Sequence, residues 1–135
     1  MTRRVAAVAL TLVALTAGRP FAAPRMVEVA SLADLARADA RTATVYVSPR
    51  LAQLTEPLAA RFIIAHELAH LRLGHRAPSA AAELAADRSA ALTLDCATVD
   101  AARRWLASLG PMQADRFHPS GTTRALALPP CQEAR

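Results

Sequence analysis

The chain has 135 residues, a length that suits one compact domain with a single core. Hydrophobic residues make up 53% of it and aromatic residues only 4%, with 34 alanines, which predicts a core of small side chains on helices and excludes a disordered chain. The formal net charge is +5, but all sixteen basic residues are arginines, which excludes chemistry that needs a lysine amine.

The first eighteen residues are typical of a secretory signal peptide. Arg3 and Arg4 precede an uncharged apolar stretch, Val5–Ala17, that ends in small residues. This stretch is shorter than the roughly 20 residues that span a bilayer, so we expect a cleaved signal and no stable membrane insertion. The alternative is an uncleaved signal that tethers the protein. We therefore predict a secreted or periplasmic protein with residues 19–135 as its single domain.

Export changes how the charge and the two cysteines are interpreted. Cleavage after Gly18 removes two arginines and no acidic residue, which leaves 14 basic and 11 acidic residues and a net charge of +3. Because the remaining arginines are scattered among acidic residues, we expect no nucleic-acid partner. Cys96 and Cys131 are predicted to form a disulfide in an oxidising compartment, with two free buried thiols as the alternative.

Two short strands and a helix are expected at the start of the mature chain. Residues Met26–Val29 and Thr42–Val47 are β-branched and alternate, which predicts strands. Between them, Ser31 is suited to cap a helix that runs to about Ala40. The segment Val45–Val47 is either an edge strand that pairs with an extended peptide or an internal strand.

Four further helices are predicted from capping residues and from apolar positions at helical spacing. They are expected from about Thr55, with Thr55 as the cap, to Gly74, after Ser79 to about Leu94, from Val99 to Leu109, and from Thr122 to Leu128. The sequence therefore predicts an α+β fold that is mostly helical, with a small sheet at its N-terminal side.

The strongest chemical signal lies in the first of these four helices, where His66 and His70 are four residues apart. Side chains at this spacing lie one turn above each other, so both imidazoles can reach one ion at about 2.0–2.1 Å. Glu67 lies about 100° round the helix, which places its carboxylate beside the metal to accept a proton from water. The alternative is a helix with two unrelated histidines. The apolar neighbours leave both histidines poorly solvated, which favours a metal.

A catalytic zinc site needs a third protein ligand and an open position. Glu83, thirteen residues after His70 and on the next predicted helix, is the candidate. Asp87 follows one turn later and is placed to accept the other ring N–H of a ligand histidine. The alternative for both is a solvated helix face, with Asp87 paired to Arg88 or Arg76. Alanines flank both carboxylates and allow close helix approach, which favours the metal site.

A third element near the C-terminus completes a recognisable set. The chain resembles the gluzincin metallopeptidases, in particular metallopeptidase family forty-eight, which includes the CAAX prenyl proteases, the HtpX-like membrane proteases and their periplasmic relatives. The three matching elements are His66-Glu67-Leu-Ala-His70, Glu83-x-x-Ala-Asp87 and His118-Pro119-Ser-Gly-Thr-Thr-Arg124. They occur in the family's order, and the resemblance covers roughly Thr42 to Leu128.

The resemblance implies one zinc ion per chain, bound by His66, His70 and Glu83. Glu67 would be the general base, and the substrate would be a polypeptide. The resemblance also identifies the zincin-type arrangement of an active-site helix followed by a ligand helix.

The outer residues of the site follow from the same resemblance. Asp87 would support a zinc ligand from behind. His118 would face the metal, as a transition-state donor or a displaceable extra ligand, with Arg124 holding that segment. Unlike the prenyl and HtpX-like proteases, the chain is expected to lack transmembrane helices, so their substrate class does not transfer to it.

His75 follows the motif closely in sequence and is a possible further ligand. The metzincin pattern requires other positions, so we interpret Gly74 and His75 as a helix C-cap with a residue suited to the helix dipole. This ending also resembles the cytoplasmic ImmA/IrrE-type gluzincins, but the signal and the His118 element favour family forty-eight.

The sequence thus predicts an exported zinc-dependent endopeptidase. The alternatives are a non-catalytic zinc-stabilised binding or chaperone-like module, an ImmA/IrrE-type gluzincin, and an enzyme that acts on a non-peptide amide. A glutamate general base has no use in a module that only binds metal, which favours the enzyme.

Overall fold

The computed structural model describes residues 23–54, 56–111 and 114–131. The predicted signal peptide and the predicted Thr55 cap lie outside the described residues. Within them, three strands precede five helices, whose bounds are β1 Arg25–Glu28, β2 Ala36–Asp39, β3 Thr44–Val47, α1 Arg50–Leu54, α2 Pro57–Leu73, α3 Ala80–Ala91, α4 Cys96–Leu109 and α5 Gly121–Ala127. The α+β, mostly helical fold with a small N-terminal sheet is confirmed.

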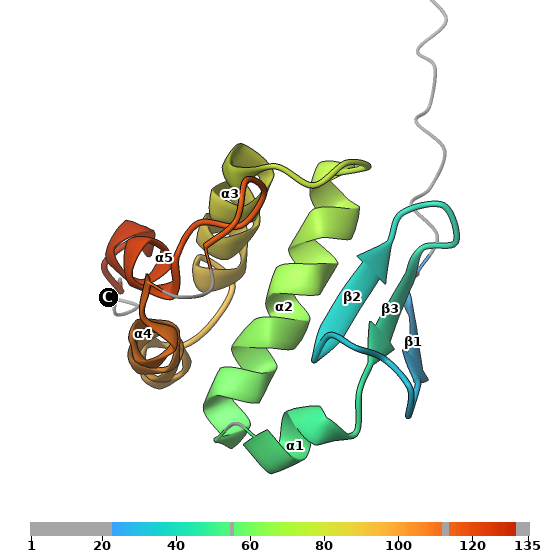
Figure 1. The fold of residues 1–135 in the computed structure, drawn as a ribbon, viewed down its shortest axis with the longest axis horizontal. Helices are drawn as coiled ribbons and strands as arrows, with labels where there is room; N and C mark the ends of the chain where they lie inside the picture. Colours follow the sequence, from blue (N-terminus) through green and yellow to red (C-terminus); the bar gives the residue numbers. More distant parts are fainter. Residues whose placement is uncertain (1–22, 55, 112–113, 132–135) are drawn as a thin grey trace, which may run out of the picture.

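The sheet has the strand order β1-β3-β2, with β1 parallel and β2 antiparallel to the central β3. Both predicted strands are present, as β1 and β3. Val45 is fully buried, and the segment Val45–Val47 is internal rather than an edge. The edge nearest the helices is β2, which runs alongside α2 (Figure 1).

The predicted helix from Ser31 to about Ala40 is wrong. The chain turns after Val29, and Ala36–Asp39 forms β2. Alternation explains the difference, because Ala36 is buried against α1 and α2 while the following Arg37 is exposed. The helix propensity of alanine is a weak preference, and pairing with β3 overrides it.

The four other predicted helices are confirmed as α2 to α5, with boundaries shifted by a few residues. Gly74 ends α2 in the left-handed conformation, at φ 68°, and Ser79 caps α3 by accepting a hydrogen bond from the Ala82 amide at 3.1 Å. The residue before α2 is Glu56, whose side chain makes no capping bond. The short α1 was not predicted, although Ser48 and Pro49 before it are suited to a helix start.

Helix α2 lies between the sheet on one side and α3, α4 and α5 on the other (Figure 1). On one side, Phe62 packs in a cluster with residues of α3, α4 and α5, many of them alanines. On the other side, Ile63 packs with Ala36 and Leu51. The small side chains allow close helix approach, as expected from the composition. No helix in the described residues is long and apolar enough to cross a membrane.

Two features hold the C-terminal segment to α4. Gly121, at the start of α5, is buried so close to α4 that a Cβ there would overlap the Leu106 carbonyl oxygen. Cys96, at the start of α4, forms the predicted disulfide with Cys131, with Cα atoms 5.3 Å apart. Together they fix α5 beside α4, and α5 carries Arg124.

Candidate metal centre

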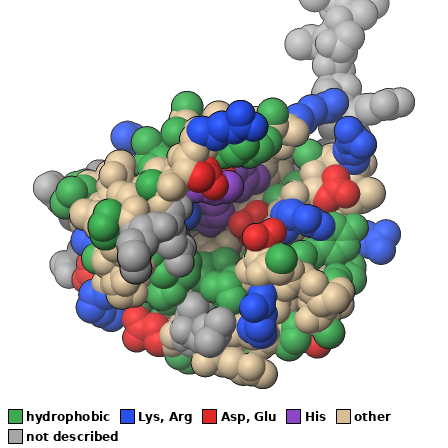
Figure 2. Space-filling model, viewed as in Figure 1, with side chains coloured by type: hydrophobic (Ala, Val, Ile, Leu, Met, Phe, Trp, Pro, Cys, Tyr) green, Lys and Arg blue, Asp and Glu red, His purple; other side chains and the backbone are tan. Residues whose placement is uncertain are grey.

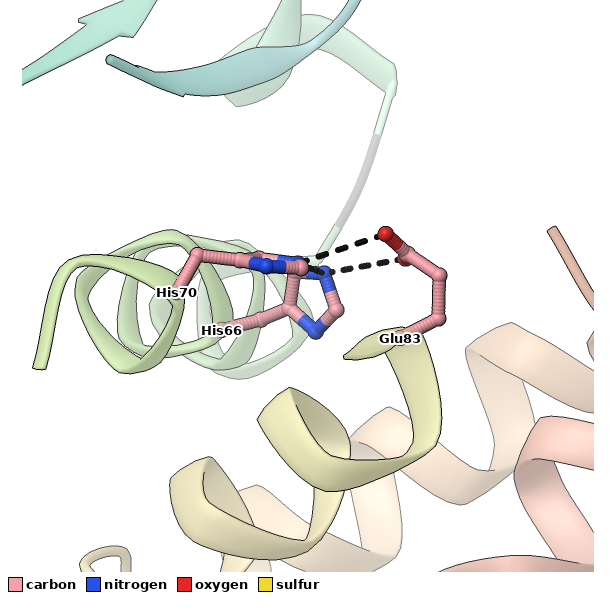
Figure 3. Close-up of side chains that lie close together, drawn as sticks. All are labelled: His66, His70 and Glu83. Atoms are coloured by element: carbon pink, nitrogen blue, oxygen red, sulfur yellow. Dashed lines mark hydrogen bonds and ion pairs between the residues drawn. The ribbon is translucent and has the colours of Figure 1, made fainter. Parts of the chain in front are cut away.

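Three side chains from two helices point at one another. His66 and His70 are on α2, and Glu83 is in the first turn of α3 (Figure 3). The two Nε2 atoms are 3.0 Å apart, and each is 3.3 Å from an oxygen of Glu83. The turn after Gly74 brings α3 back against α2, and this arrangement makes residues distant in sequence neighbours.

The donor set fits a zinc ion. Two ligands of a tetrahedral ion, each about 2.0–2.1 Å from it, must be about 3.3 Å apart, close to the three separations in this cluster. His66, His70 and Glu83 also supply the two nitrogens and one carboxylate oxygen that catalytic zinc sites use. The geometry therefore identifies these three residues as the candidate ligands.

Burial and hydrogen bonding set the protonation of the metal-free cluster. The side chains of His66 and Glu83 are 7% and 9% exposed. Burial lowers the pKa of His66, but hydrogen bonds to Asp87 and Glu83 outweigh it and raise the pKa to about 9. Burial raises the pKa of Glu83, but hydrogen bonds from His66 and His70 outweigh it and hold that pKa well below its usual range. In the metal-free cluster a positive charge, carried by the proton on His66, is thus favoured beside the ionised Glu83.

Asp87 supports His66 from behind. Its Oδ1 is 2.8 Å from His66 Nδ1, which fixes the ring so that Nε2 faces the cluster. Arg124 donates two hydrogen bonds to the Asp87 carboxylate, at 2.7 and 2.8 Å. Arg124 was expected to hold the His118 segment, and the structure places it on Asp87 instead. The alternative pairing of Asp87 with Arg88 or Arg76 is not formed.

His75 supports His70 in a similar way. Its Nδ1 is 3.0 Å from Nδ1 of His70, and its backbone N–H donates to the His70 carbonyl at the end of α2. The pKa of His75 is lowered, first by burial and then by the neighbouring His70. The C-cap interpretation therefore describes the backbone, while the contact between the rings was not anticipated from the sequence.

Glu67 faces the edge strand rather than the zinc ligands. Its Oε2 accepts a hydrogen bond of 2.7 Å from the Ala38 amide of β2. This bond holds the carboxylate beside the cluster, as the spacing in the motif predicts. The hydrogen bond between Glu67 and β2 was not predicted, because the sequence predicts a helix from Ser31 to about Ala40.

His118 lies outside the buried cluster, with a side chain 47% exposed. Its Nδ1 is 3.0 Å from the carboxylate of Asp115, which also accepts a hydrogen bond from the His118 amide. Hydrogen bonding to His118 is the main cause that lowers the pKa of Asp115 to about 2. Asp115 was not predicted, although an acidic residue three positions before a histidine was a visible signal.

The three candidate ligands, Glu67, His75, His118 and Arg124 line one open cleft of about 840 Å³. Its walls include β2, the ligand residues of α2 and α3, His118 and the apolar side chains of Trp105 and Leu109. In Figure 2 the histidines are visible at the bottom of this hollow, with acidic and basic side chains round its rim. The geometry suits a substrate that enters from solvent and reaches the metal ligands.

The comparisons with known proteins decide the family. The family model of peptidase family M48 matches residues 2–120, which include both histidines of the motif, Glu83 and His118. The chain belongs to peptidase family M48. Arg124 lies just beyond the matched segment. Searches of curated proteins and of solved structures returned no match.

Membership of the M48 family identifies a peptidase, and hence a hydrolase with polypeptide substrates. The family consists of zinc metallopeptidases, and the His-His-Glu cluster is the corresponding candidate metal site. The resemblance inferred from the three sequence elements is therefore confirmed at the level of the family.

Proposed function

We propose that this M48 protein is an exported zinc-dependent endopeptidase. The observation that carries the proposal is the convergence of His66, His70 and Glu83 in a solvent-accessible cleft, with Glu67 beside them. A purely structural zinc site is closed by four protein ligands, whereas a catalytic site keeps a position open. Among the described residues, the cluster provides three.

Zinc held by these three residues would supply a Lewis acid that makes water nucleophilic at neutral pH. Glu67 would take a proton from the attacking water and pass it to the leaving amine. Its hydrogen bond to Ala38 keeps the carboxylate aimed along the cleft wall. His66 is oriented by Asp87, and Arg124 neutralises the charge of that buried carboxylate.

The edge strand β2 is the candidate platform for substrate. In an antiparallel pair, alternate residues turn their backbone groups away from the partner strand. The amide of Ala38 points to Glu67 rather than to β3, so the backbone groups of Ala36 and Ala38 face the cleft. A bound peptide would pair with the groups that Glu67 leaves free, which gives affinity with little sequence preference.

His118 is proposed to stabilise the negative charge that develops on the substrate carbonyl oxygen. Asp115 accepts from Nδ1–H, and Nε2 would donate to the substrate oxygen when the imidazole carries a proton on both nitrogens. Its exposure allows it to approach a bound peptide.

Export is supported by the first eighteen residues, with their arginine pair and apolar stretch. The disulfide is consistent with an oxidising compartment. N-terminal sequencing of the protein recovered outside the cytoplasm tests this part, and a chain that still begins at Met1 would contradict it.

The catalytic proposal is tested by comparing the purified protein with Glu67→Gln, using Glu28→Gln as the matched control on exposed β1. We expect one zinc per chain in all three proteins. Cleavage of an unfolded protein should fall by about 10²–10⁴-fold in Glu67→Gln only, the usual contribution of a general base.

Two results would contradict the proposal. A wild-type protein without zinc would remove the metal centre. A zinc-loaded wild-type protein that binds unfolded polypeptide but cleaves it no faster than Glu67→Gln would establish the non-catalytic binding module instead.

A further inference from the structure

The charged side chains that line the cleft divide into those with a partner and those without. Arg124 is bound to Asp87, and Arg50 donates to the backbone carbonyls of Leu32 and Ala33. The carboxylates of Glu67 and Glu83 belong to the candidate metal centre. These groups are already engaged within the protein.

Arg37 and Arg76 line the same cleft and are free. Arg37 is on β2, and Arg76 is in the loop between α2 and α3. Both are exposed, and neither side chain has a hydrogen bond or ion pair with any residue that the structure describes. Basic side chains at the rim of the hollow are visible in Figure 2. Both arginines thus line the cleft without a partner in the described part of the chain and are available to a substrate there.

The free charges differ between the two ends of the cleft. Strand β2 points toward the end of α2 from which the Arg76 loop leaves (Figure 1). Asp34 precedes β2 at the opposite end, where it lines a smaller cavity together with Asp115 and His118. Arg76 therefore lies at one end of the cleft and Asp34 at the other, with Arg37 between them on β2 and Arg50 bound to the backbone carbonyls of Leu32 and Ala33 beside Asp34.

We propose that Arg76, with Arg37 between it and Asp34, binds an acidic side chain of the substrate on the amino-terminal side of the scissile bond. This proposal deepens the proposed peptidase function and rests on it. A guanidinium pairs well with a carboxylate, because its planar donors match the two oxygens. The metal centre does not oppose this preference, because the negative charges of Glu67 and Glu83 balance those of a divalent ion.

The position relative to the scissile bond follows from strand direction. A peptide that pairs antiparallel with β2, the more stable arrangement, runs opposite to it. Its amino-terminal part then lies at the end toward which β2 points, beside Arg76 and beyond Arg37. Its carboxyl-terminal part lies toward Asp34.

The experiment uses the zinc-loaded full chain and a mixture of peptides from a denatured, digested protein extract, with cleavage sites mapped by mass spectrometry. Asp and Glu should be enriched on the amino-terminal side of the cleaved bonds. One cleaved peptide is then made in two forms that differ only by Glu or Gln at the enriched position. We expect kcat/KM to favour the Glu form by on the order of fivefold, the size of an exposed ion pair.

Charge reversal locates the preference. Arg37→Glu with Arg76→Glu should abolish or invert the ratio of kcat/KM for the Glu and Gln peptides. Arg88→Glu, an exposed arginine of α3 that does not line the cleft, is the matched control and should keep the ratio. The preference should also shrink in 1 M salt, which screens exposed charges.

Binding to the Glu67→Gln protein separates the two proposals. Fluorescence anisotropy of the labelled Glu and Gln peptides reports the same preference without turnover. Equal binding of both forms, an unchanged ratio in the double variant, or acidic residues enriched only on the carboxyl-terminal side would overturn the arginine proposal. If the wild type binds the Glu form selectively but cleaves nothing, the peptidase proposal fails while the acidic preference stands.

Discussion

The two walls of the cleft are built differently. On the helical wall, from α2, α3 and α5, the charged groups are joined: the buried His66, Glu83 and Asp87 and the half-buried Arg124 all have partners within 3.3 Å. On the strand wall, Arg37 is exposed and has no side-chain partner among the described residues, and the backbone of β2 faces the cleft. Groups that perform chemistry must be held before substrate arrives, whereas groups that select substrate must remain available to it.

The largest effect on the helical wall is expected from Glu83→Ala. Loss of a ligand should lower zinc affinity more than the 10–100-fold that follows from changing a residue behind a ligand. Zinc bound per chain after gel filtration measures it, with the exposed Glu56→Ala as control. Unchanged stoichiometry and affinity would place the third ligand elsewhere, with His118 or His75 as the next candidates.

Arg124→Leu tests whether the buried network is a single unit. It removes one of the two cations beside Asp87, whose side chain is 1% exposed, and leaves only the protonated His66, so the free energy of unfolding of the metal-free protein should fall by about 1.5–3 kcal/mol. Urea unfolding measures this. The half-exposed pair of Arg61 and Asp95 is the control, and Arg61→Leu should cost about 0–1 kcal/mol. Equal losses in both variants would contradict the special role of the helical wall.

The disulfide should support α4 and α5 without setting zinc affinity. Replacing Cys96 and Cys131 by serine opens a link between residues 35 apart in sequence and should lower the free energy of unfolding by about 3–4 kcal/mol. Zinc affinity of the folded protein should be unchanged, as measured by chelator competition. A large loss of affinity in the folded variant would show that this link positions the metal centre directly.

On the strand wall, Ala38→Pro removes the amide that Glu67 accepts from, at an edge position where no sheet hydrogen bond is lost. A hydrogen bond to a charged group is worth about 1.5–3 kcal/mol, so cleavage should fall by on the order of 10–100-fold with zinc retained. Ala38→Gly keeps the amide and is the control. Equal activity of the two variants would show that Glu67 does not depend on the strand.

The pH dependence of zinc affinity gives the most gradual effect. In the metal-free protein the pKa of His66 is raised to about 9, so its interactions stabilise the fold fully below about pH 6.5 and lose that contribution as the pH rises through 9. Zinc must displace this proton, so affinity should rise by about tenfold per pH unit from 7 to about 9. Chelator competition at these pH values measures it, and a flat profile would contradict a protonated His66.

The helical wall was largely predictable from the sequence, because it depends on local rules. The spacing of His66 and His70, the Gly74 cap and the Ser79 cap together return α3 to α2 and place Glu83 opposite the histidines. Each step involves residues within a few positions of one another.

The strand wall and the outer contacts were not predictable in the same way. The alanines of β2 carry no strand preference, and only pairing with β3 makes Ala36–Asp39 extended. The bond between Arg124 and Asp87 joins residues 37 positions apart, across a packing of α5 on α4 that no local pattern encodes.

Gly121 makes the metal centre sensitive to a residue that never meets it. A single methyl group at this position would force α5 away from the Leu106 carbonyl and carry Arg124 with it, three residues further along. Asp87 would then lose the two hydrogen bonds from Arg124 and keep only His66 as its partner. The candidate metal centre can therefore be disturbed by a substitution that changes no charge, no candidate ligand and no hydrogen-bonding side chain.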